Sequence, residues 1–82
     1  MTYRIAYTDE AGAGRAALGR IRRKEFDTGV AALSRDPYGV GSCGVRGNRD
    51  RRDASIGRIA VVRYEVSPGV VTVTVLRVVP AP

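Results

Sequence analysis

Residues 55–79, SIGRIAVVRYEVSPGVVTVTVLRVV, decide the fold, because two valine-rich runs flank a Ser-Pro-Gly turn and predict a β-hairpin. Pro68 presets φ for the first central position of a type II turn, and Gly69 accepts the positive φ that the second position needs. Pairing outward from this turn predicts three pairs of cross-strand partners: Val66 with Val71, Tyr64 with Val73, and Val62 with Val75.

The predicted hairpin has two chemically different faces, because successive side chains of a strand point to opposite sides. The paired residues above share an apolar face, and Arg77 is expected on the same side near the end of the second strand. The opposite face collects four polar side chains: Arg63, Glu65, Thr72 and Thr74. The apolar face therefore needs a covering layer, whereas the polar face is free to meet a partner.

The N-terminal residues are predicted to form one strand and the first helix of that covering layer. The alternating run YRIAY at residues 3–7 predicts a first strand. Thr8 offers an N-cap hydroxyl, and Asp9 and Glu10 stand in a first helical turn, where the helix dipole favours acids. A helix is therefore expected over residues 11–18.

A second helix is predicted over residues 21–34, because Phe26, Val30 and Leu33 recur at helical spacing. It ends before Pro37, since proline disfavours helical geometry in the preceding residue. Its start is basic, which opposes the helix dipole, and the residues concerned are Arg22, Arg23 and Lys24. These cations indicate either an anionic partner or a short basic linker between two helices.

The segment between the second helix and the hairpin is rich in glycine and charge. Residues 38–48 are expected to form a loop, and the charged strip NRDRRD at 48–53 leads into a short strand at 54–56. The element order is therefore β-α-α-β-β-β. This order predicts an α+β fold, with two N-terminal helices packed on one face of a small, mainly antiparallel sheet. With 82 residues, the whole of 1–82 is expected to be a single domain.

Composition restricts the chemistry. The chain has 14 basic and 8 acidic residues, a net charge of +6, and all but one of its basic residues are arginine. This charge favours nucleic acid or an acidic protein segment as partner. A GC-rich genome, which encodes arginine in place of lysine, would explain the high ratio of arginine to lysine but not the net charge. The absence of histidine excludes Ser-His-Asp catalysis and histidine-ligated metals, and one cysteine excludes a cysteine-based zinc site. No metal and no small-molecule cofactor are expected.

The cellular setting follows from the same sequence. Cys43 is the single cysteine and has no partner for an internal disulfide, which favours a reducing compartment. No apolar stretch is long enough to span a bilayer, and the N-terminal residues lack the pattern of a signal peptide. We therefore expect a cytoplasmic protein with no membrane association.

Three short segments, in this order, resemble the RelE/ParE superfamily of bacterial toxin–antitoxin systems. YTDEA at residues 7–11 is similar to a strand-to-helix junction often written F-T-P-E-A, and AALSRDP at 31–37 to a helix end written A-L-x-x-D-P. RYEVSPGVVTVTVLRV at 63–78 resembles the closing hairpin of the family. The resemblance implies a toxin neutralised by a cognate antitoxin. RelE-type members cleave mRNA, commonly on the ribosome and without a metal, whereas ParE-type members poison DNA gyrase.

This chain departs from the family at its expected catalytic positions. Ribonucleolytic relatives usually carry an arginine three residues before the tyrosine of the closing hairpin, where this chain has Val61. Relatives also continue into a basic C-terminal segment, whereas this sequence reads VPAP at residues 79–82. No catalytic residue is therefore carried over from the family. Three activities stay open: an mRNA endonuclease, a gyrase inhibitor, and an inactive member that binds only its antitoxin.

Candidate site residues come instead from the chain's own chemistry. Glu65 is suited to act as general base on a ribose 2′-hydroxyl, Arg63 to stabilise the phosphorane charge, and Arg58 to assist from the start of the central strand. The alternative is a solvent-facing cross-strand set with Thr72 and Thr74, in which Arg63 and Glu65 only keep the sheet soluble. Four more arginines are predicted phosphate anchors, with a solvated loop as the alternative: Arg46, Arg49, Arg51 and Arg52.

Overall fold

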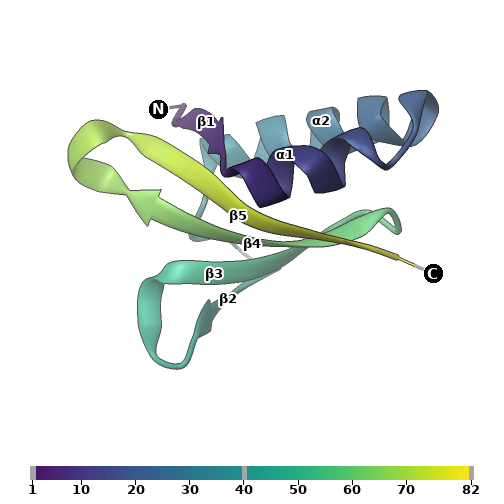
Figure 1. Ribbon diagram of the computed structural model, residues 1–82. Helices are drawn as coiled ribbons and strands as arrows, with labels where there is room; N and C mark the ends of the chain where they lie inside the picture. The colour runs from purple at the N-terminus through teal and green to yellow at the C-terminus, as the bar shows by residue number, and fades with distance from the viewer. Residues whose placement is uncertain (1, 40, 82) are drawn as a thin grey trace.

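The computed structural model describes residues 2–39 and 41–81, which form two helices and one five-stranded sheet (Figure 1). In chain order the elements are β1 (Arg4–Tyr7), α1 (Asp9–Ala16), α2 (Arg20–Arg35), β2 (Ser42–Val45), β3 (Asn48–Ile56), β4 (Ala60–Ser67) and β5 (Thr72–Pro80). The strand order is β1-β5-β4-β3-β2, with β1 parallel to β5 and every other pair antiparallel. Figure 1 shows both helices on one side of the sheet. The predicted α+β architecture is confirmed.

Thr8 starts α1 as predicted. Its hydroxyl oxygen accepts a hydrogen bond from the backbone N–H of Ala11 at 3.1 Å, which satisfies a free donor of the first helical turn. The same hydroxyl donates to the carbonyl of Leu76 at 3.0 Å and so ties the start of α1 to β5. Arg15 then binds Asp27 through two hydrogen bonds of 2.7 and 2.6 Å, which join α1 to α2.

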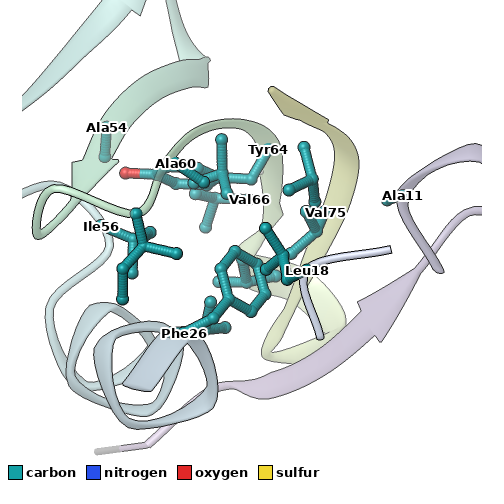
Figure 2. Packing of buried hydrophobic residues seen from close by; sticks show 14 residues of the cluster. Ala11, Leu18, Phe26, Ala54, Ile56, Ala60, Tyr64, Val66 and Val75 are labelled. Carbon is teal, nitrogen blue, oxygen red and sulfur yellow. The ribbon is translucent and has the colours of Figure 1, made fainter. Parts of the chain in front are cut away.

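The core lies between the helices and the inner face of the sheet. Phe26 and Val30 project from α2 at the predicted helical spacing, and each is at least 99% buried. Figure 2 shows the Phe26 ring among side chains from the strands and from the turn between the helices. Tyr64 is fully buried on β4, and its hydroxyl donates to the carbonyl of Pro37 at 2.5 Å. The segment that follows α2 is therefore anchored to the centre of the sheet.

The register of the closing hairpin differs from the prediction. The connection spans residues 68–71, with a 3₁₀ turn at Pro68–Val70 and Val71 at φ 48°, so it is longer than the expected two-residue turn. The partners are Val66 with Val73 and Tyr64 with Val75, a shift of two residues on β5. Because side chains alternate with a period of two, this shift leaves every residue near the turn on its predicted face.

A β-bulge in β5 then exchanges the faces of the side chains at the end of this strand. Tyr64 pairs with Val75 and Arg63 pairs with Arg77, so Leu76 is an extra residue on β5. An inserted residue moves all later side chains to the opposite face. Val78 is therefore buried, and Arg77 lies on the outer face, so its predicted apolar placement was wrong.

The segment predicted as loop and charged strip is largely β-structure. Residues 42–45 form β2, and the strip at 48–53 is the first two thirds of the nine-residue β3. The two strands are joined by Arg46 and Gly47, whose φ values of 51° and 77° are the positive pair that a type I′ hairpin turn requires. The glycines of this segment serve a hairpin instead of a loop. The charges of the strip are accommodated because β4 offers opposite charges across the sheet.

Candidate functional site

The face of the sheet that the helices leave uncovered is here called the open face. Its side chains come from the three central strands, as the cross-strand register shows: Arg51 and Asp53 from β3, Val61, Arg63 and Glu65 from β4, and Thr74, Arg77 and Val79 from β5. Arg63 and Glu65 therefore share the open face, as expected. Thr74 lies directly opposite Glu65.

Two cross-strand ion pairs occupy the centre of the open face. The Arg63 guanidinium binds Asp53 through two of its donors, Nε to Oδ1 at 2.8 Å and Nη2 to Oδ2 at 3.0 Å. Two residues further along each strand, Arg51 Nη2 binds Glu65 Oε2 at 3.1 Å. The four charges of these two pairs alternate in sign and sum to zero, whereas Arg77, the register partner of Arg63, adds a further positive charge to this face.

The ion pair of Asp53 and Arg63 shifts the proton affinity of both groups. The hydrogen bond from Arg63 holds the pKa of the Asp53 carboxyl below its usual value, and burial opposes this effect. The hydrogen bond to Asp53 raises the pKa of Arg63 further above its usual value. All four side chains of the two pairs are between 39 and 47% exposed, so solvent weakens both attractions. A stronger anion therefore has access to both guanidinium groups.

A hollow of about 430 Å³ adjoins these pairs, next to the turn between β2 and β3. Its lining consists of Val45, Arg46, Asn48, Arg51 and Arg63. Three guanidinium groups thus border one open depression. Guanidinium groups present planar donor forks that match phosphate oxygens. This hollow is the most suitable place on the open face for a phosphate group.

Arg58 is not brought to this hollow. It was expected at the start of the central strand, but β4 begins at Ala60, and Arg58 lies in the turn at residues 57–59. Glu65 lies near the opposite end of β4. The structure therefore brings together two of the three predicted catalytic residues.

The four predicted phosphate anchors separate into two groups. Arg46 and Arg51 line the hollow. Arg52 instead faces the side of the sheet that carries the helices, where it donates to the Ser42 hydroxyl at 2.9 Å and to the Ser42 and Arg49 carbonyls at 3.2 and 2.9 Å. Arg49 stacks on the ring of Tyr38, with its guanidinium carbon 4.2 Å from the ring centroid. Arg52 thus holds β2 against β3, and each of its three guanidinium nitrogens already donates a hydrogen bond within the protein.

Tyr38 is the centre of that second group. Its hydroxyl donates to the Asp50 carboxylate at 2.6 Å, and the Arg52 guanidinium carbon lies 5.5 Å from its ring centroid. The hydrogen bond to Asp50, followed by burial, raises the pKa of Tyr38 to about 12. Cation–π contact and hydrogen bonding together fix this ring against the charged end of β3.

We expect the Asp50→Asn variant to lower the pKa of Tyr38 from about 12 towards 10.0, because the carboxylate no longer favours the neutral phenol. A pKa that is raised in the folded state means that this stabilisation is fully present below pH 10 and is lost as pH rises through about 12. The phenolate absorbance during alkaline titration measures the midpoint, and Tyr38→Phe identifies which tyrosine gives the signal. An unchanged midpoint in Asp50→Asn would show that the hydrogen bond is not its cause.

Asp53 and Arg77 are open-face residues that sequence reasoning did not place there. Asp53 was assigned to a charged strip outside the sheet, although the alternation of Arg51, Asp53 and Ser55 with Arg52, Ala54 and Ile56 was a signal for a longer strand. Arg77 was placed on the wrong side by the bulge. Its Nε lies 3.7 Å from the Glu10 carboxylate of α1. Val61 and Val79 face each other beside Arg77 and are 44% and 49% exposed.

Within residues 2–39 and 41–81, no three histidine, cysteine, aspartate or glutamate side chains lie close enough together to hold a metal ion. The same part of the chain has no helix long and apolar enough to cross a membrane.

Comparison with solved structures shows three close matches in fold. A chain of the toxin–antitoxin complex RelBE2 from Mycobacterium tuberculosis is 22% identical with a TM-score of 0.80, and the match covers 98% of this chain and 99% of that one. The isolated RelE toxin of E. coli is 20% identical with a TM-score of 0.79, with 98% and 85% covered. A YoeB/ParE toxin from Agrobacterium tumefaciens is 14% identical with a TM-score of 0.75, with 96% and 99% covered. No protein-family model matches the sequence, and no curated protein matches it.

Proposed function

We propose that this chain, which has the fold of the RelE/ParE-superfamily toxins, is the toxin of a toxin–antitoxin system and acts on RNA in the cytoplasm through its open face. The observation that carries the RNA assignment is the hollow bordered by Arg46, Arg51 and Arg63. Phosphate contacts of this kind position a nucleic acid strand without reading its sequence. Translated mRNA is the proposed substrate.

The proposed chemistry is metal-independent cleavage of the RNA backbone. Glu65 removes the proton from a ribose 2′-hydroxyl, whose oxygen attacks the adjacent phosphorus while the bond from phosphorus to the 5′ oxygen breaks. Arg63 donates hydrogen bonds to the charged phosphorane oxygens, and water protonates the departing 5′ oxygen. The products are a 2′,3′-cyclic phosphate and a 5′-hydroxyl end. Glu65 then gives its proton to the hydroxide that the water leaves, so atoms and charge balance and no other reactant is needed.

A cognate antitoxin is the proposed protein partner. The RelBE2 structure and an archaeal RelE–RelB structure from Pyrococcus horikoshii, which matches this chain with a TM-score of 0.73, are both complexes of this type. A net charge of +6 favours an acidic segment in the partner.

A second candidate is a toxin that binds without cleaving, either a gyrase inhibitor or a member that binds only its antitoxin. The observation that favours it is that Arg63 and Glu65 are both held in ion pairs, to Asp53 and Arg51. Cleavage requires a strand of RNA to separate both pairs. If the two ion pairs serve only to stabilise the sheet, they remain intact and no RNA is needed to separate them.

Induced expression of the chain alone in a bacterial host separates these functions. We expect growth arrest together with new transcript ends inside translated codons, mapped by primer extension. Arrest with intact transcripts and DNA damage would support gyrase inhibition instead. Normal growth with soluble, folded protein would leave antitoxin binding as the function.

A further inference from the structure

Two exposed valines form a cross-strand pair on the open face. Val61 of β4 faces Val79 of β5, and of the large apolar side chains exposed on the described residues these are the two that pair with each other. Ser55 of β3 faces Val61 from the other side, so this row of the sheet carries no charge. Apolar area with a charged rim is typical of a site where another protein binds.

The neighbouring row supplies that charged rim. Arg63 and Arg77 lie directly opposite each other, two residues along each strand from the valines, and like charges at facing positions repel. Asp53 compensates Arg63 through two hydrogen bonds. The Arg77 guanidinium makes no hydrogen bond within residues 2–39 and 41–81, and the carboxylate with which it forms an ion pair, that of Glu10, is 3.7 Å away and exposed. Arg77 therefore presents an unused donor fork to an incoming anion.

A small hollow joins the two rows. Its volume is about 110 Å³, and its lining consists of Asp53, Val61, Arg63, Arg77 and Val79. Because a cavity of about 150 Å³ is needed to hold a benzene ring, this hollow suits one aliphatic side chain better than a nucleobase. Its described lining also contains no aromatic ring on which a base would stack. The four residues Val61, Val79, Arg63 and Arg77 are here called the β4–β5 patch, and their chemistry favours a protein segment over RNA.

The charge of the patch decides which protein segment fits. Residues 40–82 carry seven arginines against three acids, which is four of the six net positive charges of the chain. A two-fold contact between copies of this chain would set the patch against itself, and Arg63 and Arg77 would then face the same cations. An acidic partner relieves this repulsion, whereas a second copy increases it.

We propose that the β4–β5 patch is the docking site for a protein segment that places an aliphatic side chain against Val61 and Val79 and a carboxylate on Arg77. The valine and the arginine of each strand are two residues apart, and in an extended segment side chains two residues apart also share a face. The matching segment therefore carries an aliphatic residue and an acid with one residue between them. The inference rests on the proposed function only in identifying the owner of this segment as the cognate antitoxin.

The test measures fluorescence anisotropy of three labelled synthetic peptides of equal length with the purified chain. The peptides are repeats of Leu-Ser-Glu, of Ser-Ser-Glu, which lacks the aliphatic side chain, and of Leu-Ser-Gln, which lacks the acid. The Leu-Ser-Glu peptide is expected to bind at least about tenfold more tightly than either of the others, because it alone buries apolar area and bonds a charged donor together.

Variants of the patch assign the two contacts separately. Val61→Thr/Val79→Thr keeps the β-branched shape and is expected to weaken Leu-Ser-Glu binding by at least about fivefold, with Ser-Ser-Glu binding unchanged. Arg77→Gln is expected to abolish the preference for Leu-Ser-Glu over Leu-Ser-Gln. Val70→Thr changes an exposed valine in the turn between β4 and β5, outside the patch, and should bind like wild type. Thermal unfolding checks that every variant is folded.

Each further outcome bears on the inference. Equal binding of Leu-Ser-Glu and Ser-Ser-Glu to the wild-type chain, or binding of neither, would overturn it. If the double valine variant loses affinity for single-stranded RNA as strongly as for the peptide, the patch belongs to RNA and the inference is wrong. Dimerisation in analytical ultracentrifugation that the valine variant abolishes would assign the patch to a second copy and overturn it as well. Selective Leu-Ser-Glu binding by a chain that neither binds RNA nor arrests growth supports the inference and removes only the proposed function.

Discussion

Phe26→Ala is expected to lower the free energy of unfolding by about 3–5 kcal/mol, the usual cost of deleting a fully buried phenylalanine. The Phe26 ring is 0% exposed and bridges α2 to the sheet (Figure 2), so its loss leaves a cavity between the two layers. Small domains have total stabilities of about 5–15 kcal/mol, so this one change removes a large share. Urea unfolding followed by circular dichroism measures the shift in midpoint at a constant slope.

The matched control lies five residues earlier on the same helix. Ile21 is 76% exposed, and Ile21→Ala is expected to change stability by no more than about 0.5 kcal/mol. If Phe26→Ala is too unstable to purify, Phe26→Leu keeps most of the apolar volume and should show a smaller loss in the same direction. Equal losses at both helix positions would mean that the helical layer does not pack on the sheet through Phe26.

The elements that the sequence predicted well are those set by local chemistry. Thr8 caps α1 because a hydroxyl at that position reaches the N–H of Ala11 whatever the rest of the chain does. Phe26 and Val30 face the core because helical spacing puts them on one side. The hairpin faces were right even though the register was shifted by two residues, since a shift of two leaves each side chain on its face.

The features that were missed depend on contacts between distant segments. The bulge at Leu76 exists where β5 pairs with β4, and nothing in the local sequence of β5 marks it. The strip at residues 48–53 lies in β3, which pairs with β2 and β4 on its two sides, and Arg51 and Asp53 meet the opposite charges of Glu65 and Arg63 there. The same long-range pairing decided the candidate site. It joined Glu65 to the guanidinium of Arg51 and Arg63 to the carboxylate of Asp53, and it left Arg58 in a turn.

Glu65→Gln is expected to slow RNA cleavage by about 10²–10⁴-fold, the range for loss of a positioned general base. The amide keeps the size of the side chain, but it cannot accept the proton of the 2′-hydroxyl. RNA binding is not expected to weaken, because Arg51 is freed from its pair with Glu65 and becomes available to phosphate. The combination of a lower cleavage rate with unchanged or tighter binding therefore distinguishes a general base from a structural partner. Single-turnover cleavage and equilibrium binding of one RNA oligonucleotide measure the two quantities.

Asp53→Asn provides the matched control, because it removes a carboxylate from the neighbouring ion pair and leaves Glu65 in place. Freed from Asp53, Arg63 is expected to bind RNA phosphate up to about fivefold more tightly, since an exposed pair is worth at most about 1 kcal/mol. Cleavage should persist in this variant. If both variants lose cleavage equally, the carboxylates hold the arginines in position and neither is the base. If neither variant loses it, the chemistry lies outside the two ion pairs, and the hollow of Arg46, Arg51 and Arg63 only positions the strand.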